Sequence, residues 1–135
     1  VKIFVRNRNL HDFLKEWQQA KITVGFNNKS FDSHMICKEF GLSSVPPQVD
    51  LMHEAAHYGL RGGLKKIEHL IGYKRKDQVC KNGEDAILLW HNYCKHGNEQ
   101  SLEYLIRYNC EDVYSLIFLF NKLLHMSLEN TLIVL

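Results

Sequence analysis

The chain of 135 residues contains little proline and no strong excess of charge of either sign. Two prolines and eight glycines exclude a collagen-like or linker composition. No apolar run approaches the roughly 18 residues that a membrane-spanning helix needs. Lysine and arginine number 17 against 15 acidic residues, so the net charge of +2 does not by itself indicate a partner.

Cysteine is also scarce, and its spacing excludes the usual paired motifs. No Cys-x-x-Cys pair is formed by the four cysteines, which are Cys37, Cys80, Cys94 and Cys110. A chain of this length can bury enough apolar surface to fold without disulfides. We therefore expect reduced thiols in an intracellular, cytoplasmic protein. The first residues also lack the order of basic, apolar and small residues that marks a signal peptide.

What is present is the composition of a folded domain. Hydrophobic residues make up 45% and charged residues 24%, which is too apolar for a disordered segment. The expected strands lie at 1–5, 22–26 and 48–52, and the expected helices at 10–17, 31–40, 64–71, 86–94 and 102–124. Because strands come early, helices come late and no linker separates them, we expect residues 1–135 to form one α/β domain.

The string His53-Glu54-Ala55-Ala56-His57 matches the H-E-x-x-H pattern of zinc proteases. On a helix this spacing places two imidazoles one turn apart, with the glutamate as base. The site needs a third ligand, but the extended motif requires glycine where Leu60 stands and histidine where Gly63 stands. With eight histidines in the chain a chance pair is expected, so an ordinary helix surface is the favoured interpretation.

Two other segments place carboxylates where a ligand could reach them. Asp32 follows Phe31 where a predicted strand turns into a helix, and ligands bind at the carboxyl ends of strands in α/β sheets. Tyr108 and Asp112 are four residues apart, so their phenol and carboxylate share one helix face. There is an alternative interpretation for each segment. Asp32 is then a plain helix N-cap, and Asp112 is an aspartate at the edge of the core beside a packed Tyr108. If the two aspartates converge across a sheet, they suit Mg²⁺ or Mn²⁺.

The order of motifs resembles that of the DEDD exonucleases of the tyrosine type, which have a ribonuclease-H-like fold. The resemblance lies in Asn27-x-x-x-Phe31-Asp32 and Tyr108-Asn109-x-x-Asp112-Val113. Between them, the strings at 62–68, 72–75 and 83–90 resemble the YprB-like family of predicted exonucleases. The similarity extends from about residue 21 to 119, and it implies a partial mixed sheet flanked by helices.

The resemblance also implies an activity and a set of site residues. It implies a metal-dependent 3′–5′ exonuclease that uses two Mg²⁺ or Mn²⁺ ions to hydrolyse DNA or RNA, with a single-stranded 3′ end as substrate. Asp32 and Asp112 match metal-binding aspartates, and Tyr108 matches the tyrosine that orients the attacking water. Residues expected to contact nucleic acid are Asn27 and the basic residues Lys65, Lys66, Lys74 and Arg75.

One part of the family pattern is absent. The first motif, a D-x-E on the first strand, supplies two of the four metal carboxylates, and this sequence contains no such string. Since the chain begins with Val1 rather than methionine, we expect the motif on a strand upstream, in a larger parent protein with further domains. The chain as written is then expected to be inactive. The second hypothesis is a non-catalytic ribonuclease-H-like module that binds nucleic acid or a partner protein.

Overall fold

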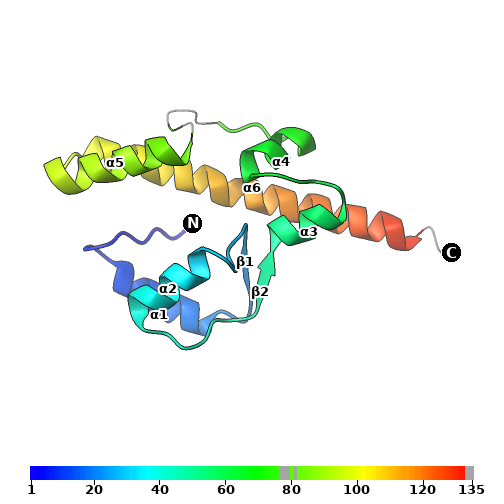
Figure 1. Ribbon diagram of the computed structural model, residues 1–135, viewed down its shortest axis with the longest axis horizontal. Coiled ribbons are helices and arrows are strands. Elements are labelled where there is room, and N and C mark those ends of the chain that lie inside the picture. The colour runs from blue at the N-terminus through cyan, green and yellow to red at the C-terminus, as the bar shows by residue number, and fades with distance from the viewer. Residues whose placement is uncertain (77–79, 81, 133–135) are drawn as a thin grey trace.

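The computed structural model describes residues 1–76, 80 and 82–132. Helices predominate in it, and Figure 1 shows the order of the elements along the chain. These elements are α1 (Leu10–Gln19), β1 (Thr23–Gly25), α2 (Asp32–Phe40), β2 (Gln48–Asp50), α3 (Leu51–His57), α4 (Leu64–Ile71), α5 (Gly83–His96) and α6 (Glu99–Leu132). The expected mixture of α and β structure is confirmed, and the observed sheet is small.

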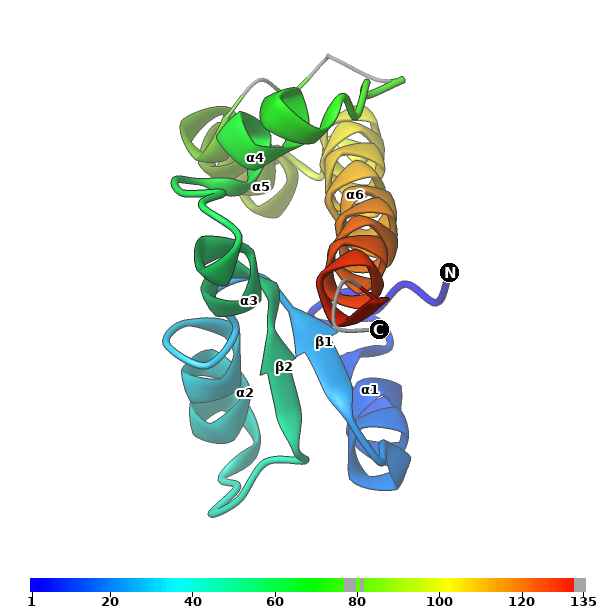
Figure 2. The same cartoon turned by 90° about the vertical axis from the view of Figure 1, so that its right-hand side faces the viewer.

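The sheet consists of β1 and β2, which run parallel with Val24 opposite Val49 and Gly25 opposite Asp50. Parallel strands need a crossover connection, and α2 supplies it. Figure 2 shows the two strands between α2 on one side and α1 on the other. Among the described residues the sheet is therefore purely parallel, whereas the family resemblance implied part of a mixed sheet.

The strand predicted at residues 1–5 is wrong, because these residues form no strand in the structure. A strand exists only where its backbone pairs with a neighbour, and an apolar string cannot show whether a neighbour is present. The segment instead packs by its side chains: the Phe4 ring meets Phe13 of α1 edge-on at 5.5 Å, and Phe13 lies 6.0 Å from Phe40 of α2.

Helix ends follow local signals. α2 ends at Gly41 with a φ of 63°, and α4 ends at Gly72 with a φ of 79°. Both values lie in the left-handed region, which glycine adopts without the steric cost that a Cβ would add. The two glycines therefore end their helices where the sequence predicts it.

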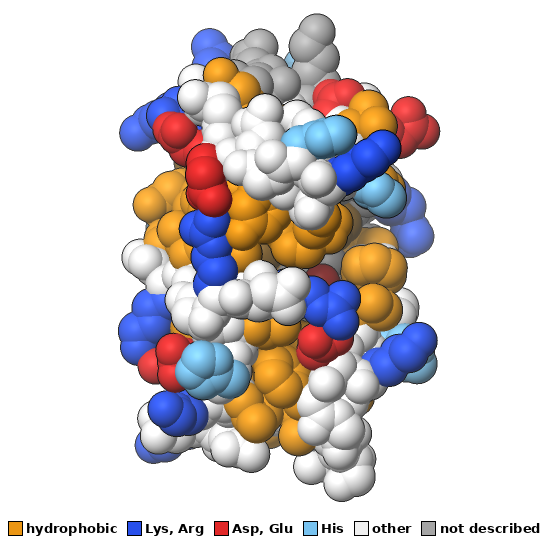
Figure 3. Space-filling model, turned by 90° about the vertical axis from the view of Figure 1, so that its left-hand side faces the viewer, with side chains coloured by type: hydrophobic (Ala, Val, Ile, Leu, Met, Phe, Trp, Pro, Cys, Tyr) orange, Lys and Arg blue, Asp and Glu red, His pale blue; other side chains and the backbone are white. Residues whose placement is uncertain are grey.

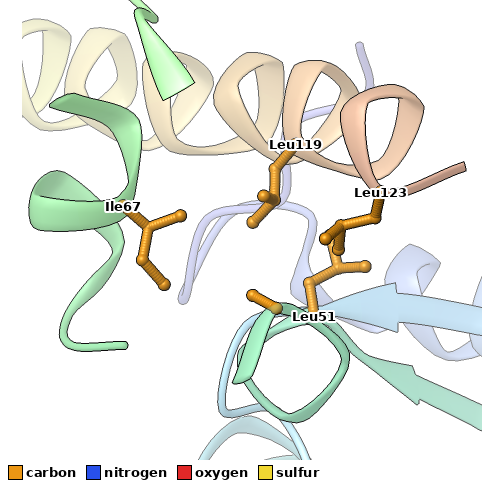
Figure 4. Packing of buried hydrophobic residues seen from close by; sticks show 5 residues of the cluster. Leu51, Ile67, Leu119 and Leu123 are labelled. Carbon is orange, nitrogen blue, oxygen red and sulfur yellow. The ribbon is translucent and has the colours of Figure 1, made fainter. Parts of the chain in front are cut away.

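The core joins α3 and α4 to α6. Figure 4 shows Leu51, Ile67, Leu119 and Leu123 pointing toward one another, and Ala55 completes this buried cluster. α6 is 34 residues long and contacts α3, α4 and α5 along its length. No helix in the described ranges is long and apolar enough to cross a membrane.

A groove lies where the first residues of the chain run beside α5 and α6. Its volume is about 430 Å³, and it is lined by Val1, Lys2, Ile3, Phe4, Val5, Arg6, Leu10, Trp90, Leu102, Leu105, Ile106, Asn109, Cys110 and Val113. Hydrophobic side chains also gather in a band on the face drawn in Figure 3. The lining of this groove includes neither Asp32, Tyr108 nor Asp112.

Candidate functional site

The loop between β1 and α2 is organised by the carboxylate of Asp50, at the carboxyl end of β2. Its Oδ1 accepts hydrogen bonds from the backbone N–H groups of Asn27 at 2.8 Å and Met52 at 3.1 Å, and its Oδ2 accepts one from Lys29 at 3.3 Å. Asp50 is 1% exposed, so these bonds replace the water that burial removes. The strand predicted at 48–52 therefore ends at Asp50. The side chain of Asp50 accepts a hydrogen bond from the N–H of Met52 and so caps the start of α3.

Sequence reasoning missed Asp50. The strand predicted at 48–52 placed Asp50 in its middle, so the end-of-strand signal that selected Asp32 did not mark this residue. Asn27, expected to contact nucleic acid, lies in the organised loop with its N–H on Asp50 and a φ of 57°. Asparagine is one of the few residues that adopt this left-handed conformation readily. The side chain of Asn28 beside it is buried.

Gly25 lets this loop pass close to the strand, which gives a testable prediction. A Cβ at Gly25 would lie 2.6 Å from Cβ of Asn28 and 2.8 Å from its Cγ, closer than carbon atoms can approach. Gly25→Ala should therefore lower the free energy of unfolding by about 1–3 kcal/mol, measured by urea denaturation. The control is Gly83→Ala, where a Cβ meets nothing within 4 Å and stability should not fall. Equal stability of the two variants would contradict the close approach.

Asp32 is the first residue of α2 and is exposed to solvent. The N-cap of α2 is Phe31, so the alternative of Asp32 as a plain N-cap is wrong. Partial burial of its carboxyl group raises its pKa above the ordinary value, and the negative charge of Asp50 adds to the rise. The Asp32 carboxylate at the start of α2 thus lies close enough to that of Asp50, at the end of β2, for the two charges to affect each other.

Asp112 lies on α6 beside a second group of charges. The Arg75 guanidinium donates to Oδ1 of Asp112 at 2.5 Å, and to both carboxylate oxygens of Glu68, at 2.8 and 2.7 Å. Burial raises the pKa of the Asp112 carboxyl, and Arg75 opposes that rise. Burial would also raise the pKa of Glu68, but hydrogen bonds from Arg75 and Ser115 bring it below its ordinary value.

Tyr108 lies one turn before Asp112 and is covered by two cations. Lys65 Nζ lies 4.7 Å from the centroid of its ring, and Arg75 Cζ lies 5.4 Å from it. Burial raises the pKa of the phenol, with a further contribution from the charge of Asp112. The phenol therefore stays protonated at neutral pH, which suits a hydrogen-bond donor better than a base.

The structure separates the basic residues that sequence reasoning grouped together. Lys65 and Arg75 lie beside Tyr108, and the Arg75 side chain is only 12% exposed. Lys66 and Lys74 are exposed. The sequence does not show that Arg75 pairs with Glu68 and Asp112. Of these two carboxylates, only that of Glu68 lies near Arg75 along the chain.

The described residues do not by themselves fit a metal ion. Carboxylate oxygens are the donors that Mg²⁺ prefers, but within the described ranges no three His, Cys, Asp or Glu residues are grouped closely enough to hold one. His53, Glu54 and His57 are exposed on α3. No hydrogen bond among the described residues joins Asp32 to Asp112, and the latter carboxylate is engaged by Arg75. This arrangement of the described residues therefore supports no catalytic step through a metal.

The four cysteines carry no disulfide in the structure.

Comparison with known proteins gives one match: the family model of the RNase H superfamily matches residues 2–124. Searches of the curated proteins and of the solved structures found no match.

Proposed function

Since this chain belongs to the RNase H superfamily, we propose that it is a nuclease domain that acts as a 3′–5′ exonuclease on DNA or RNA. Members of the superfamily are generally nucleases that act on nucleic acid. The finer assignment rests on this chain's own residues, and a single-stranded 3′ end is the substrate we propose.

The observation that supports this function is the pairing of Tyr108 with Asp112 on one face of α6, beside Lys65 and Arg75. A protonated phenol there can donate a hydrogen bond to the attacking water or to a phosphate oxygen. The charge of Lys65 attracts the phosphates of a strand without regard to its sequence, whereas Arg75 is already paired with Glu68 and Asp112. These roles lie within the part of the chain that the family model covers.

Superfamily nucleases typically use divalent metal ions, and Mg²⁺ or Mn²⁺ is the cofactor we propose. Asp32 and Asp112 would supply two carboxylates, and the D-x-E string that would supply two more does not occur in this sequence. Two-metal hydrolysis by these residues therefore requires carboxylates in addition to Asp32 and Asp112.

The test is hydrolysis of a labelled single strand by the full-length protein with Mg²⁺ or Mn²⁺. Asp112→Asn should reduce the rate by more than about tenfold, since loss of even an indirect partner of a metal site costs that much. The matched control is Asp12→Asn, which changes an exposed ion pair with Lys15 on α1 and should leave the rate unchanged. Equal rates for wild type and Asp112→Asn would overturn the assignment of this site.

A non-catalytic module that binds nucleic acid is the second candidate function. The observation that favours it is the ion pair between Arg75 and Asp112, which leaves this carboxylate already paired. Fluorescence anisotropy with the same labelled strand separates the two candidates. Binding without hydrolysis at any concentration of Mg²⁺ or Mn²⁺ would establish the binding module instead of the exonuclease.

A further inference from the structure

The positive charge of the chain is concentrated in one segment. Six of the 17 lysine and arginine residues lie at 58–76, where Glu68 is the only acidic residue. This segment therefore carries a formal charge of +5, and the remaining residues carry −3, which together give the +2 of the whole chain. The small net charge thus hides a strongly basic segment, formed by α4 and the turns on either side of it.

The one acidic side chain in this segment does not neutralise its surface. Glu68 is buried, and its carboxylate accepts two hydrogen bonds from Arg75, at 2.8 and 2.7 Å. Because Arg75 is itself largely buried, this pair of charges faces inward. Four further cations are exposed and form no ion pair with a carboxylate within the described ranges: Arg61, Lys66, Lys74 and Lys76.

Contacts with α6 bring both ends of α4 to the ring of Tyr108. Lys65, in the first turn of α4, places Nζ 4.7 Å from the centroid of that ring, and Arg75, beyond the end of α4, places Cζ 5.4 Å from it. The N–H of Lys76 donates to Glu111 of α6 at 3.3 Å, which fastens this turn to the same helix. The exposed cations next to these residues in the chain are therefore held near Tyr108, on the side of α6 away from α1 and α2 (Figure 1).

We propose that the four exposed cations form a phosphate-binding surface, the α4 surface, which holds a single-stranded nucleic acid where the strand leads to Tyr108. The inference rests on the proposed function, which supplies nucleic acid as the partner, and it adds where the strand lies outside the pair of Tyr108 and Asp112. Lysine and arginine attract phosphates without regard to sequence. An anionic lipid surface would attract them too, but membership of the RNase H superfamily favours nucleic acid. Arg75 is not part of this surface, because it is paired with Glu68 and Asp112.

The test is fluorescence anisotropy of a labelled single strand of deoxythymidines, titrated with the chain in the presence of EDTA so that binding is measured without hydrolysis. Lys66→Gln with Lys74→Gln should weaken binding about 20-fold at roughly 0.1 M salt, because each phosphate contact with a single strand contributes about 0.7 to the slope of log K against log salt. The slope itself should fall by about 1.4, the signature of two lost phosphate contacts.

The matched control is Lys21→Gln with Lys38→Gln. It removes the same charge from exposed lysines before β1 and on α2, on the other side of α6 from α4. Its affinity should stay within about twofold of wild type, with an unchanged slope, because salt screens charges that are far from the strand. All four lysines are exposed, so both variants should keep the fold, which circular dichroism checks. Equal weakening by the two pairs would show that only the total charge matters, and would overturn the α4 surface.

The remaining outcomes separate the inference from the proposed function. Strand binding that is the same in wild type and in the variant at 66 and 74 overturns the inference, and hydrolysis by Asp112→Asn then judges the proposed function by itself. If wild type binds no strand, the inference is also overturned, and binding to vesicles that contain phosphatidylserine would identify anionic lipid as the partner. If binding depends on Lys66 and Lys74 but no strand is hydrolysed with Mg²⁺ or Mn²⁺, the inference stands and the exonuclease assignment fails.

Discussion

Replacing Asp50 by alanine is expected to lower the free energy of unfolding by about 3 kcal/mol or more. The variant removes the acceptor of the backbone N–H groups of Asn27, Lys29 and Met52, and each buried donor left without a partner costs about 1–3 kcal/mol. Urea denaturation followed by circular dichroism measures the loss. Amide exchange at Asn27 and Lys29 should also become faster, because their N–H groups are no longer held.

The control for this prediction is Asp50→Asn. Asparagine keeps an oxygen at the Oδ1 position that Asn27 and Met52 share, but its NH₂ group cannot accept from Lys29. The loss should then be about 1–3 kcal/mol, the cost of the one donor left without a partner. A similar loss for the alanine and asparagine variants would mean that the carboxylate does not hold the loop.

Leu119→Ala should lower the free energy of unfolding by about 2–5 kcal/mol, since it leaves a cavity in the cluster where α3, α4 and α6 meet. Leu119 is fully buried there, between Leu51 and Ile67 of the neighbouring helices. Leu128→Ala makes the same chemical change on the same helix at a side chain 59% exposed, and should cost less than about 0.5 kcal/mol. Comparable losses in the two variants would show that α6 does not pack as described.

The parts of the fold that depend on local chemistry could be predicted from the sequence. Gly41 and Gly72 end their helices because the left-handed conformation is a property of one residue and its neighbours. The strand at 1–5 could not be excluded, because strand formation depends on a partner that may come from anywhere in the chain. β2 was predicted too long for the same reason: Asp50 ends it through contacts with a loop more than 20 residues earlier.

In the candidate site too, only the features that depend on local spacing could be predicted from the sequence. Helical spacing alone places Tyr108 and Asp112 on one face, and both do lie beside the same guanidinium. That guanidinium belongs to a residue 37 positions before Asp112, and no periodicity in the sequence connects them. Sequence reasoning assigned Arg75 to nucleic acid because an unpaired surface arginine and a buried paired one look alike in a string of letters.

The length of α6 has a consequence for how the molecule opens. Asp112 and Leu119 are seven residues apart on one unbroken helix, about two turns, so the candidate site and the core share a continuous ladder of backbone hydrogen bonds. Such a stretch tends to exchange its amide protons as one cooperative unit. Fluctuations that expose the core would therefore also dissolve the site, and a destabilised variant would lose its ligand affinity together with its core rather than before it.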